Sequence, residues 1–446
     1  MNTDFPAQSP TPEPSDSSQQ RVLQPRLRST RIFRGSIIVL ALLLLMSTIA
    51  ATFVLRTMPR AQASGGPPTP TPTPITPVPG QPLPQGSLYT AAPGGLTRID
   101  LKSSNVLWTI PASYPSAPLV MGKALFFDNE DSTSPVLEAA DTKTGASLWS
   151  SQTYPNGFLL GAGNMLYDSS CDLSTTGVPC HLYGINASTG AQLWSYDVPS
   201  GNAWIALQNG VLYGVSYTVY FALNASTGVP LWQKDLLNYT DQEANMTPVV
   251  RGNVLSFASC NETKQSTGYT GCYLYAFNAS TGEEFWHMPT TSSLQVPPSI
   301  MDGVVYAGAI DGTLYAVNEL TGELLWSTNV GSAIGQVLSS AGTVYVETIG
   351  ADGQSFNVEA FDAATHAPRW GQASASIASL IVSIPLVWHA AASAGPASHP
   401  FVLTHGLIYI QSDANTITVL KATDGSGVIQ YTVPGNALSG FTVVMQ

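Results

Sequence analysis

The sequence predicts an all-β protein: an eight-bladed β-propeller of four-stranded antiparallel blades, preceded by one transmembrane helix and a Pro-rich stalk. Three observations predict this architecture. They are an uncharged apolar run near the start, a proline-rich segment after it, and a repeat of roughly 40–45 residues with strand-like patterning. The 446 residues include 39 Gly and 33 Pro, and only 10% are charged. Such a composition is typical of many short strands joined by turns.

The apolar run covers residues 35–55 and contains no charged residue, so it is long enough to cross a bilayer as a helix. Five arginines precede it and two follow it closely. The positive-inside rule therefore places residues 1–34, a predicted disordered tail, in the cytoplasm and the rest of the chain outside the cell membrane. Residues 56–85 are rich in Pro and Thr and are predicted to be a semi-rigid stalk. The alternative is a signal peptide cleaved after Ala63, but the long apolar run and the long region before it favour a single-pass anchor.

Residues 86–446 carry the repeat, in which an Asp or Asn lies eight positions before a Trp. Five of the seven copies also have Gly four positions before the Trp. The seven tryptophans are Trp108, Trp149, Trp194, Trp232, Trp286, Trp326 and Trp370. We expect the Asp or Asn to bond the backbone of a turn, the Gly to supply a positive φ, and the Trp to pack between adjacent sheets.

An eighth copy is weaker, with Lys421 at the Asp/Asn position, Gly425 at the Gly position and Ile429 in place of Trp. The first copy, which begins at residues 87–91, lacks an innermost strand. The chain ends with a strand-like segment, 441–445, that has no blade of its own. Because an open sheet edge is a liability, we expect this last segment to pair with residues 87–91 and close the ring of eight blades.

The charge of the chain argues against nucleic-acid binding. The net charge is −12, and after residue 60 the chain has 9 basic and 25 acidic residues. A domain with that excess of negative charge repels a phosphate backbone.

The [DN]-x-x-T-G-x-x-x-W core of the unit resembles the repeat of the quinoprotein-type, PQQ-binding-like β-propellers over residues 86–446. That family includes PQQ-dependent dehydrogenases, a non-catalytic lipoprotein of outer-membrane-barrel assembly, and sensor ectodomains of membrane kinases. The resemblance implies that a dehydrogenase would carry adjacent cysteines against its cofactor and a set of calcium-ligating carboxylates. This chain has no Cys-Cys pair and no CxxCH motif, and the carboxylate set cannot be placed on it. We therefore expect the non-catalytic branch, with no catalytic residue, cofactor or metal.

The four cysteines predict two local disulfides. Cys180 and Cys272 each lie 14 residues before the Trp of their repeat, and Cys171 and Cys260 lie just across the preceding hairpin loop. Disulfides persist in extracytoplasmic domains. Metal binding is the alternative, but the chain lacks a CxxC pair and a matching His spacing.

Two segments depart from the repeat. Asp128, Glu130 and Ser132 alternate in a manner faintly similar to a calcium loop, but the Gly of such a loop is missing, so a solvated hairpin tip is the preferred interpretation. Residues 371–400 form an apolar insertion. It is predicted to be a long strand with a covering loop or, alternatively, a partner-docking element.

Together these features predict a membrane-anchored, extracytoplasmic binding or scaffolding module that is not an enzyme. Its expected partners are the membrane, through the anchor, and a protein or surface polymer. The alternatives are a diverged PQQ-dependent dehydrogenase and the ectodomain of a sensor complex that signals through another subunit.

Overall fold

The computed structural model describes residues 83–129, 136–151, 159–171, 180–199, 201, 203–236, 242–243, 246–265, 268–349, 355–370, 382–383, 401–413, 415–434 and 438–445. The chain divides into two units, 1–73 and 74–446, and the described residues all belong to the second. The predicted tail, the membrane span at 35–55 and nearly all of the stalk lie outside them. Within the described ranges, no helix is long and apolar enough to span a membrane.

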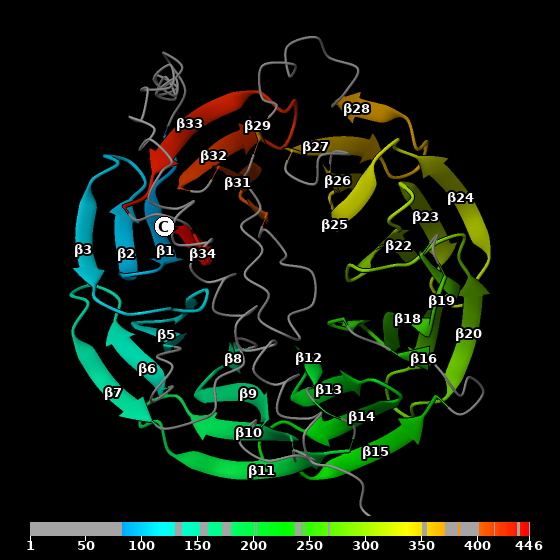
Figure 1. Cartoon of the computed structure of the whole chain (residues 1–446), viewed down its shortest axis with the longest axis horizontal. Coiled ribbons are helices and arrows are strands. Elements are labelled where there is room, and N and C mark those ends of the chain that lie inside the picture. The colour runs from blue at the N-terminus through cyan, green and yellow to red at the C-terminus, as the bar shows by residue number, and fades with distance from the viewer. Residues whose placement is uncertain are drawn as a thin grey trace, which may run out of the picture. The chain divides into compact units, whose positions relative to one another are not determined.

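The described strands form eight antiparallel sheets that are arranged around a ring (Figure 1). Every sheet has a path of four strands, ordered from the centre of the ring to its outside. The predicted all-β, eight-bladed propeller of four-stranded blades is therefore confirmed. We number the blades 1 to 8 in chain order.

The strands of blades 1 to 4 follow, each blade from its inner to its outer strand. Blade 1 contains β34 (Gly440–Met445), β1 (Gly86–Ala92), β2 (Gly95–Asp100) and β3 (Val106–Ile110). Blade 2 contains β4 (Leu119–Met121), β5 (Ala124–Asn129), β6 (Val136–Asp141) and β7 (Ser147–Ser151). Blade 3 contains β8 (Leu159–Ala162), β9 (Met165–Cys171), β10 (Cys180–Asn186) and β11 (Gln192–Val198). Blade 4 contains β12 (Trp204–Gln208), β13 (Val211–Ser216), β14 (Val219–Asn224) and β15 (Pro230–Asp235).

Blades 5 and 7 each have one additional short strand. Blade 5 contains β17 (Val249–Arg251), β18 (Val254–Gln265), β19 (Gly268–Asn278) and β20 (Glu284–Pro289), with β16 (Gln242–Glu243) also paired to β18. Blade 6 contains β21 (Ser299–Met301), β22 (Val304–Gly308), β23 (Thr313–Asn318) and β24 (Leu324–Asn329). Blade 7 contains β25 (Ala333–Ser340), β26 (Thr343–Ile349), β27 (Ser355–Asp362) and β28 (Pro368–Trp370), with β29 (Val382–Ser383) also paired to β27. Blade 8 contains β30 (Val402–Thr404), β31 (Leu407–Asp413), β32 (Thr416–Lys421) and β33 (Gly427–Thr432).

The Asp or Asn of the repeat ends the third strand of its blade, as predicted. In blade 2, Asp141 Oδ1 accepts hydrogen bonds from the backbone N–H groups of Lys143 and Thr144, at 3.0 and 2.8 Å. The N–H of Gly145 donates to the Asp141 carbonyl, and Gly145 has a φ of 72°. The carboxylate thus satisfies the donors that the strand leaves at the turn.

The tryptophans pack between blades, and most of them bond the next blade. The indole N–H groups of Trp108, Trp149, Trp232, Trp286 and Trp370 donate to the carbonyl oxygens of Thr142, Ala187, Ala279, Glu319 and Ala422, respectively, at 2.9–3.1 Å. Each acceptor directly follows the Asp/Asn position of the next repeat. The repeat therefore specifies the contact between blades as well as the turn within each blade.

The Gly of the repeat has a second role that the sequence analysis did not predict. A Cβ built on Gly190 would lie 2.6 Å from the ring of Trp149 in the preceding blade. The equivalent contacts of Gly228 with Trp194 and of Gly425 with Trp370 are 2.5 and 2.7 Å. Gly is therefore favoured in these blades both for its positive φ and because the tryptophan ring rests on its Cα.

The ring closes through both ends of the propeller sequence, as predicted. β34 pairs antiparallel with β1, with Ser87 opposite Val444 and Thr90 opposite Phe441. β34 is therefore the innermost strand of blade 1, although it is the last of the described strands in sequence (Figure 1).

A tyrosine replaces the missing tryptophan where blade 8 meets blade 1. Ile429 occupies the Trp position, and the Tyr431 hydroxyl donates to the Leu101 carbonyl at 2.7 Å across the seam. Leu101 directly follows Asp100, so its carbonyl is the acceptor that a tryptophan would otherwise bond. At the closing seam the acceptor is still the carbonyl that follows the Asp/Asn position, but the donor is a tyrosine hydroxyl and not an indole N–H.

The core consists of clusters between neighbouring blades. The cluster between blades 2 and 3 contains Phe126, Leu137, Leu166 and Ile185. A separate cluster between blades 3 and 4 contains Tyr167. Because successive residues of a strand point to opposite faces, each blade buries apolar side chains on both faces.

We predict that Gly190→Ala destabilises the propeller more than Gly163→Ala. Both positions have positive φ, but a Cβ at Gly163 would meet no atom within 4 Å. Gly163→Ala should cost about 1–2 kcal/mol for the left-handed backbone alone. Gly190→Ala should add about 1–3 kcal/mol because the new methyl group overlaps the Trp149 ring. Urea unfolding followed by tryptophan fluorescence measures both, and equal losses would show that the contact with Trp149 contributes nothing.

A second prediction concerns the closing seam. Tyr431→Phe should lower the free energy of unfolding by about 1–3 kcal/mol, because it leaves the buried Leu101 carbonyl without its donor. Tyr409→Phe is the matched control, since the Tyr409 hydroxyl donates to a weak acceptor, Met445 Sδ, at 3.5 Å. Thermal and urea unfolding of the two variants should separate them, and an equal effect would contradict the role assigned to Tyr431.

Candidate binding face

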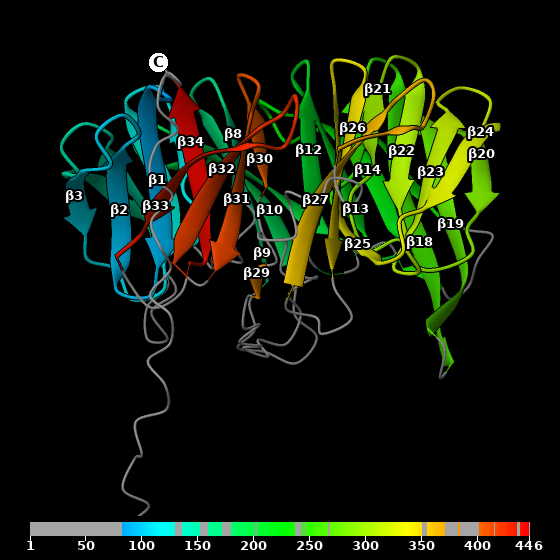
Figure 2. The same cartoon turned by 90° about the horizontal axis from the view of Figure 1, so that it is seen from above.

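The two rims of the propeller differ in what they carry. Strands alternate in direction within each blade, so the Asp/Asn turns and the hairpins between first and second strands lie on one rim, which we call the turn face. The connections between second and third strands lie on the opposite rim, which we call the loop face. The β18–β19 hairpin projects from the loop face beyond the other strands (Figure 2).

Both predicted disulfides are present, and both lie at the loop face. Cys171 bonds Cys180 and Cys260 bonds Cys272, with Cα atoms 4.0 Å apart in each pair. In both cases the two cysteines are directly opposite each other on paired second and third strands. Each disulfide therefore cross-links the second and third strands of a single blade.

The β18–β19 hairpin is the longest in the described part of the chain, with strands of 12 and 11 residues. Its pairing continues past the Cys260–Cys272 disulfide, so that Lys264 lies opposite Tyr269. The register shifts on either side of Asn261, which breaks the regular ladder just beyond the disulfide. The disulfide thus fixes the base of a hairpin whose tip extends away from the blade.

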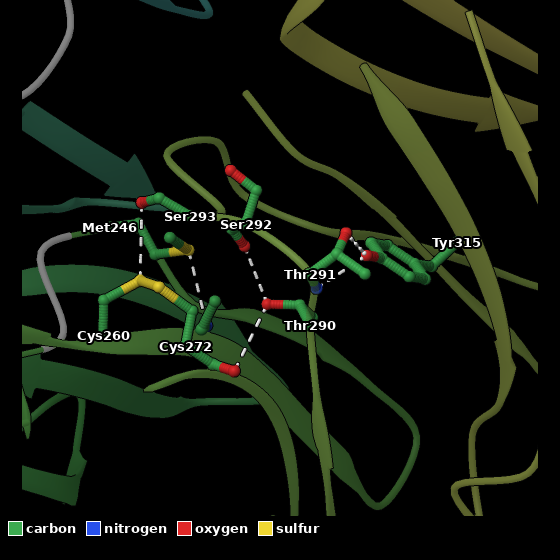
Figure 3. Close-up of a disulfide and its surroundings, with 9 residues drawn as sticks. Met246, Cys260, Cys272, Thr290, Thr291, Ser292, Ser293 and Tyr315 are labelled. Atoms are coloured by element: carbon green, nitrogen blue, oxygen red, sulfur yellow. Dashed lines mark hydrogen bonds between the residues drawn. A yellow bond between two sulfur atoms is a disulfide. The ribbon is translucent and has the colours of Figure 1, made fainter. Parts of the chain in front are cut away.

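Polar bonds connect this base to blade 6 (Figure 3). The Thr290 hydroxyl donates to the Ser292 carbonyl at 2.8 Å and to the Cys272 carbonyl at 3.3 Å. Thr291 N–H donates to the Tyr315 hydroxyl of β23 at 3.0 Å. The connection between blades 5 and 6 is therefore held from both sides.

An aspartate orders the same connection. The Thr291 hydroxyl donates to Asp311 Oδ2 at 2.8 Å, and Thr313 N–H donates to Asp311 Oδ1 at 2.9 Å. Burial opposes ionisation of Asp311, but these hydrogen bonds outweigh it and hold its pKa below the ordinary value. The carboxylate is thus kept charged beside the loop face.

Asp128 is not at a solvated hairpin tip, contrary to the sequence interpretation. It lies within β5 and its side chain is fully buried, whereas Glu130 and Ser132 lie outside the described residues. Asp168 of β9 in the next blade is also fully buried. Burial, and secondarily the charge of Asp128, raises the pKa of Asp168 well above its ordinary value.

Two buried glutamates in blade 7 were missed by the sequence analysis. Glu347 is 2% exposed and Glu359 is 7% exposed, on the second and third strands. Oε1 of Glu347 has no hydrogen-bond partner among the described residues. Burial raises the pKa of Glu347 to about 8. A charged residue inside the apolar strand TVYVETI was the available signal.

No group of three or more His, Cys, Asp or Glu side chains in the described ranges is arranged to hold a metal. Of the insertion at 371–400, only Val382 and Ser383 are described, and they pair with Phe356 and Ser355 of β27. The remainder of that predicted docking element lies outside the described residues. The loop face therefore carries one projecting hairpin with a disulfide at its base. Buried carboxylates lie inside the blades.

We predict that the buried Glu347 makes stability depend on pH. Its pKa is raised from 4.5 to about 8, so the folded state holds this proton more tightly than the unfolded state. The resulting stabilisation is complete below about pH 4.5 and falls by about 1.4 kcal/mol per pH unit as the pH rises toward 8. Glu347→Gln should lower the slope by about 1.4 kcal/mol per pH unit and give the more stable protein at pH 8. The slope that remains comes from other buried carboxyl groups, such as Asp168. The exposed Glu323→Gln should leave the slope as in wild type, and a Glu347→Gln slope equal to that of wild type would contradict the assignment.

The sequence matches the family described as outer membrane protein assembly factor BamB over residues 70–203 and 180–427, most of the chain. No curated protein sequence matches it. Among solved structures, BamB from Moraxella catarrhalis is 18% identical with a TM-score of 0.50, covering 78% of this chain and 100% of that one.

Two further solved structures share the fold. The computationally designed Ika8 protein is 14% identical with a TM-score of 0.52, covering 78% of this chain and 97% of that one. The quinohemoprotein alcohol dehydrogenase ADHIIG from Pseudomonas putida HK5 is 12% identical with a TM-score of 0.50, covering 79% and 69%. At these identities the likeness extends to the fold alone, and the family match assigns the chain. The chain belongs to the PQQ-like β-propeller family described as outer membrane protein assembly factor BamB.

Proposed function

We propose that this chain is a non-catalytic binding or scaffolding propeller that holds a protein partner at its loop face. The observation that carries the proposal is the β18–β19 hairpin, which extends past the Cys260–Cys272 disulfide on that face. A hairpin fixed at its base presents its backbone edges with little loss of conformational freedom on binding. The name of the matching family, an assembly factor, supports a role in holding other proteins.

The cysteines support a non-catalytic role. The chain has four cysteines, and all four are used in two separate disulfides within blades 3 and 5. None is left to form a ring of adjacent cysteines against a quinone. The family resemblance leads us to expect that ring in the dehydrogenases.

The proposed location follows from the sequence. The apolar segment 35–55 and the arginines around it support a single-pass anchor with the propeller outside the cell membrane. The Pro-rich composition of residues 56–85 supports a semi-rigid spacer between the anchor and the propeller.

The test is a change of the hairpin tip alone. Residues 262–269 are replaced by Asn-Gly, so that Asn261 and Thr270, already opposite each other, are joined by a two-residue turn. The disulfide and both blade neighbours are retained. Full-length wild type and variant are purified from detergent-solubilised membranes, and the proteins that accompany each are compared. We expect the main partner to be lost from the variant while its thermal midpoint stays within a few degrees of wild type.

The control variant changes another exposed surface. Leu148, Leu193 and Leu231 of the outer strands are each more than half exposed, at 54%, 54% and 53%. Replacing all three with Ser should leave the partner bound. Loss of the partner in this triple variant, with retention in the shortened-hairpin variant, would place the binding surface on the outer strands and refute the loop-face proposal.

A further inference from the structure

The seam between blades 2 and 3 brings buried oxygen atoms together from two sheets. On β5, Phe126 packs in the cluster between blades 2 and 3, so Asp128, two residues further, points to the same seam. On β9, Leu166 packs in that cluster, so Asp168 and then Ser170 also point to it. The side chain of Ser169, which lies between them in sequence, points to the other face of β9. The two aspartates therefore face each other across one seam, with Ser170 beside Asp168.

Ser169 provides an independent check of this orientation. Its hydroxyl oxygen accepts a hydrogen bond from Ala203 N–H at 2.9 Å, and Ala203 directly precedes β12 of blade 4. Ser169 thus points away from blade 2, as the strand alternation requires of the residue between Asp168 and Ser170.

The seam is closed to solvent at these positions. Asp128 and Asp168 are 0% exposed and Ser170 is 1% exposed. Asp168 forms no ion pair with any described residue. The Ser170 hydroxyl has no hydrogen-bond partner among the described residues, although a buried hydroxyl is costly without one. At this depth, and beside a second carboxylate, the Asp168 carboxylate cannot stay ionised without a positive charge next to it.

The chemistry of these atoms favours a hard cation. Carboxylate and hydroxyl groups offer only oxygen, which Ca²⁺ and Mg²⁺ prefer over nitrogen and sulfur. The nearby imidazole of His181, opposite Ser170 in the register, is engaged by Asp197 at 2.9 Å. The flexible coordination of Ca²⁺ suits ligands from two separate sheets better than the strict octahedron of Mg²⁺.

We propose that Asp128, Asp168 and Ser170 form a calcium-binding site that links blade 2 to blade 3. The ion supplies the positive charge that the Asp168 carboxylate lacks among the described residues, and the Ser170 hydroxyl oxygen binds it as a neutral ligand. Bound there, it joins two blades at their loop-face ends, where the tryptophan contact of the turn face does not reach.

The experiment uses the full chain in detergent, stripped with EDTA and returned to buffer. Equilibrium dialysis with ⁴⁵Ca²⁺ should show one saturable site, and Ca²⁺ should raise the thermal midpoint more than Mg²⁺ at matched ionic strength. Asp168→Asn should weaken Ca²⁺ binding by on the order of 100-fold, and Ser170→Ala by about 10-fold. Glu347→Gln, which neutralises a buried carboxylate in blade 7, should bind Ca²⁺ as wild type does.

Two results would overturn the proposal. The first is the absence of saturable Ca²⁺ binding to the wild-type chain, a measurement that needs no variant to fold. The second is unchanged binding in Asp168→Asn, which would place the ion elsewhere. If wild type binds no Ca²⁺ and Asp168→Asn is more stable than wild type, the two aspartates share a proton instead.

Discussion

The packing of a tryptophan from one blade on a glycine of the next is the contact on which the ring depends. A single four-stranded sheet cannot bury both of its faces, so each blade is stable only against its neighbours. The tryptophan fills the wedge between two sheets, and in five seams its indole N–H also bonds a turn carbonyl of the next blade. Because that carbonyl follows the Asp/Asn of the turn, one short motif fixes both the end of a strand and the position of the adjacent sheet.

Much of the fold could be predicted because this motif is local in sequence. The Asp141 turn, the blade count and the pairing of residues 441–445 with 87–91 all follow from spacing and from the absence of one strand in the first copy. The close approach of Gly190 to Trp149 could not be predicted in the same way, because it joins residues of different repeats. The positive φ of the turn is by itself a sufficient reason for glycine at position 190. Nothing in the sequence therefore indicates that a tryptophan of the preceding blade also packs on this glycine.

In the candidate site, too, features within one repeat could be predicted from the sequence and contacts between repeats could not. The disulfides were predictable because Cys180 and Cys272 occupy equivalent positions in two repeats, each with a partner one hairpin away. Asp128 was misinterpreted because the polar run after it is typical of a loop, while β5 continues through it. Its approach to Asp168 depends on which face of each strand meets the next blade, and that is decided by packing between repeats.

The position of β34 has a consequence for the making of the protein. Since residues 440–445 supply the innermost strand of blade 1, the ring stays open until these residues have left the ribosome. Until then β1 presents an unpaired inner edge, and such edges readily recruit strands of other chains. A nascent chain interrupted before residue 440 would thus keep an unpaired edge that can bind other chains, and synthesis of β34 is the step that removes it.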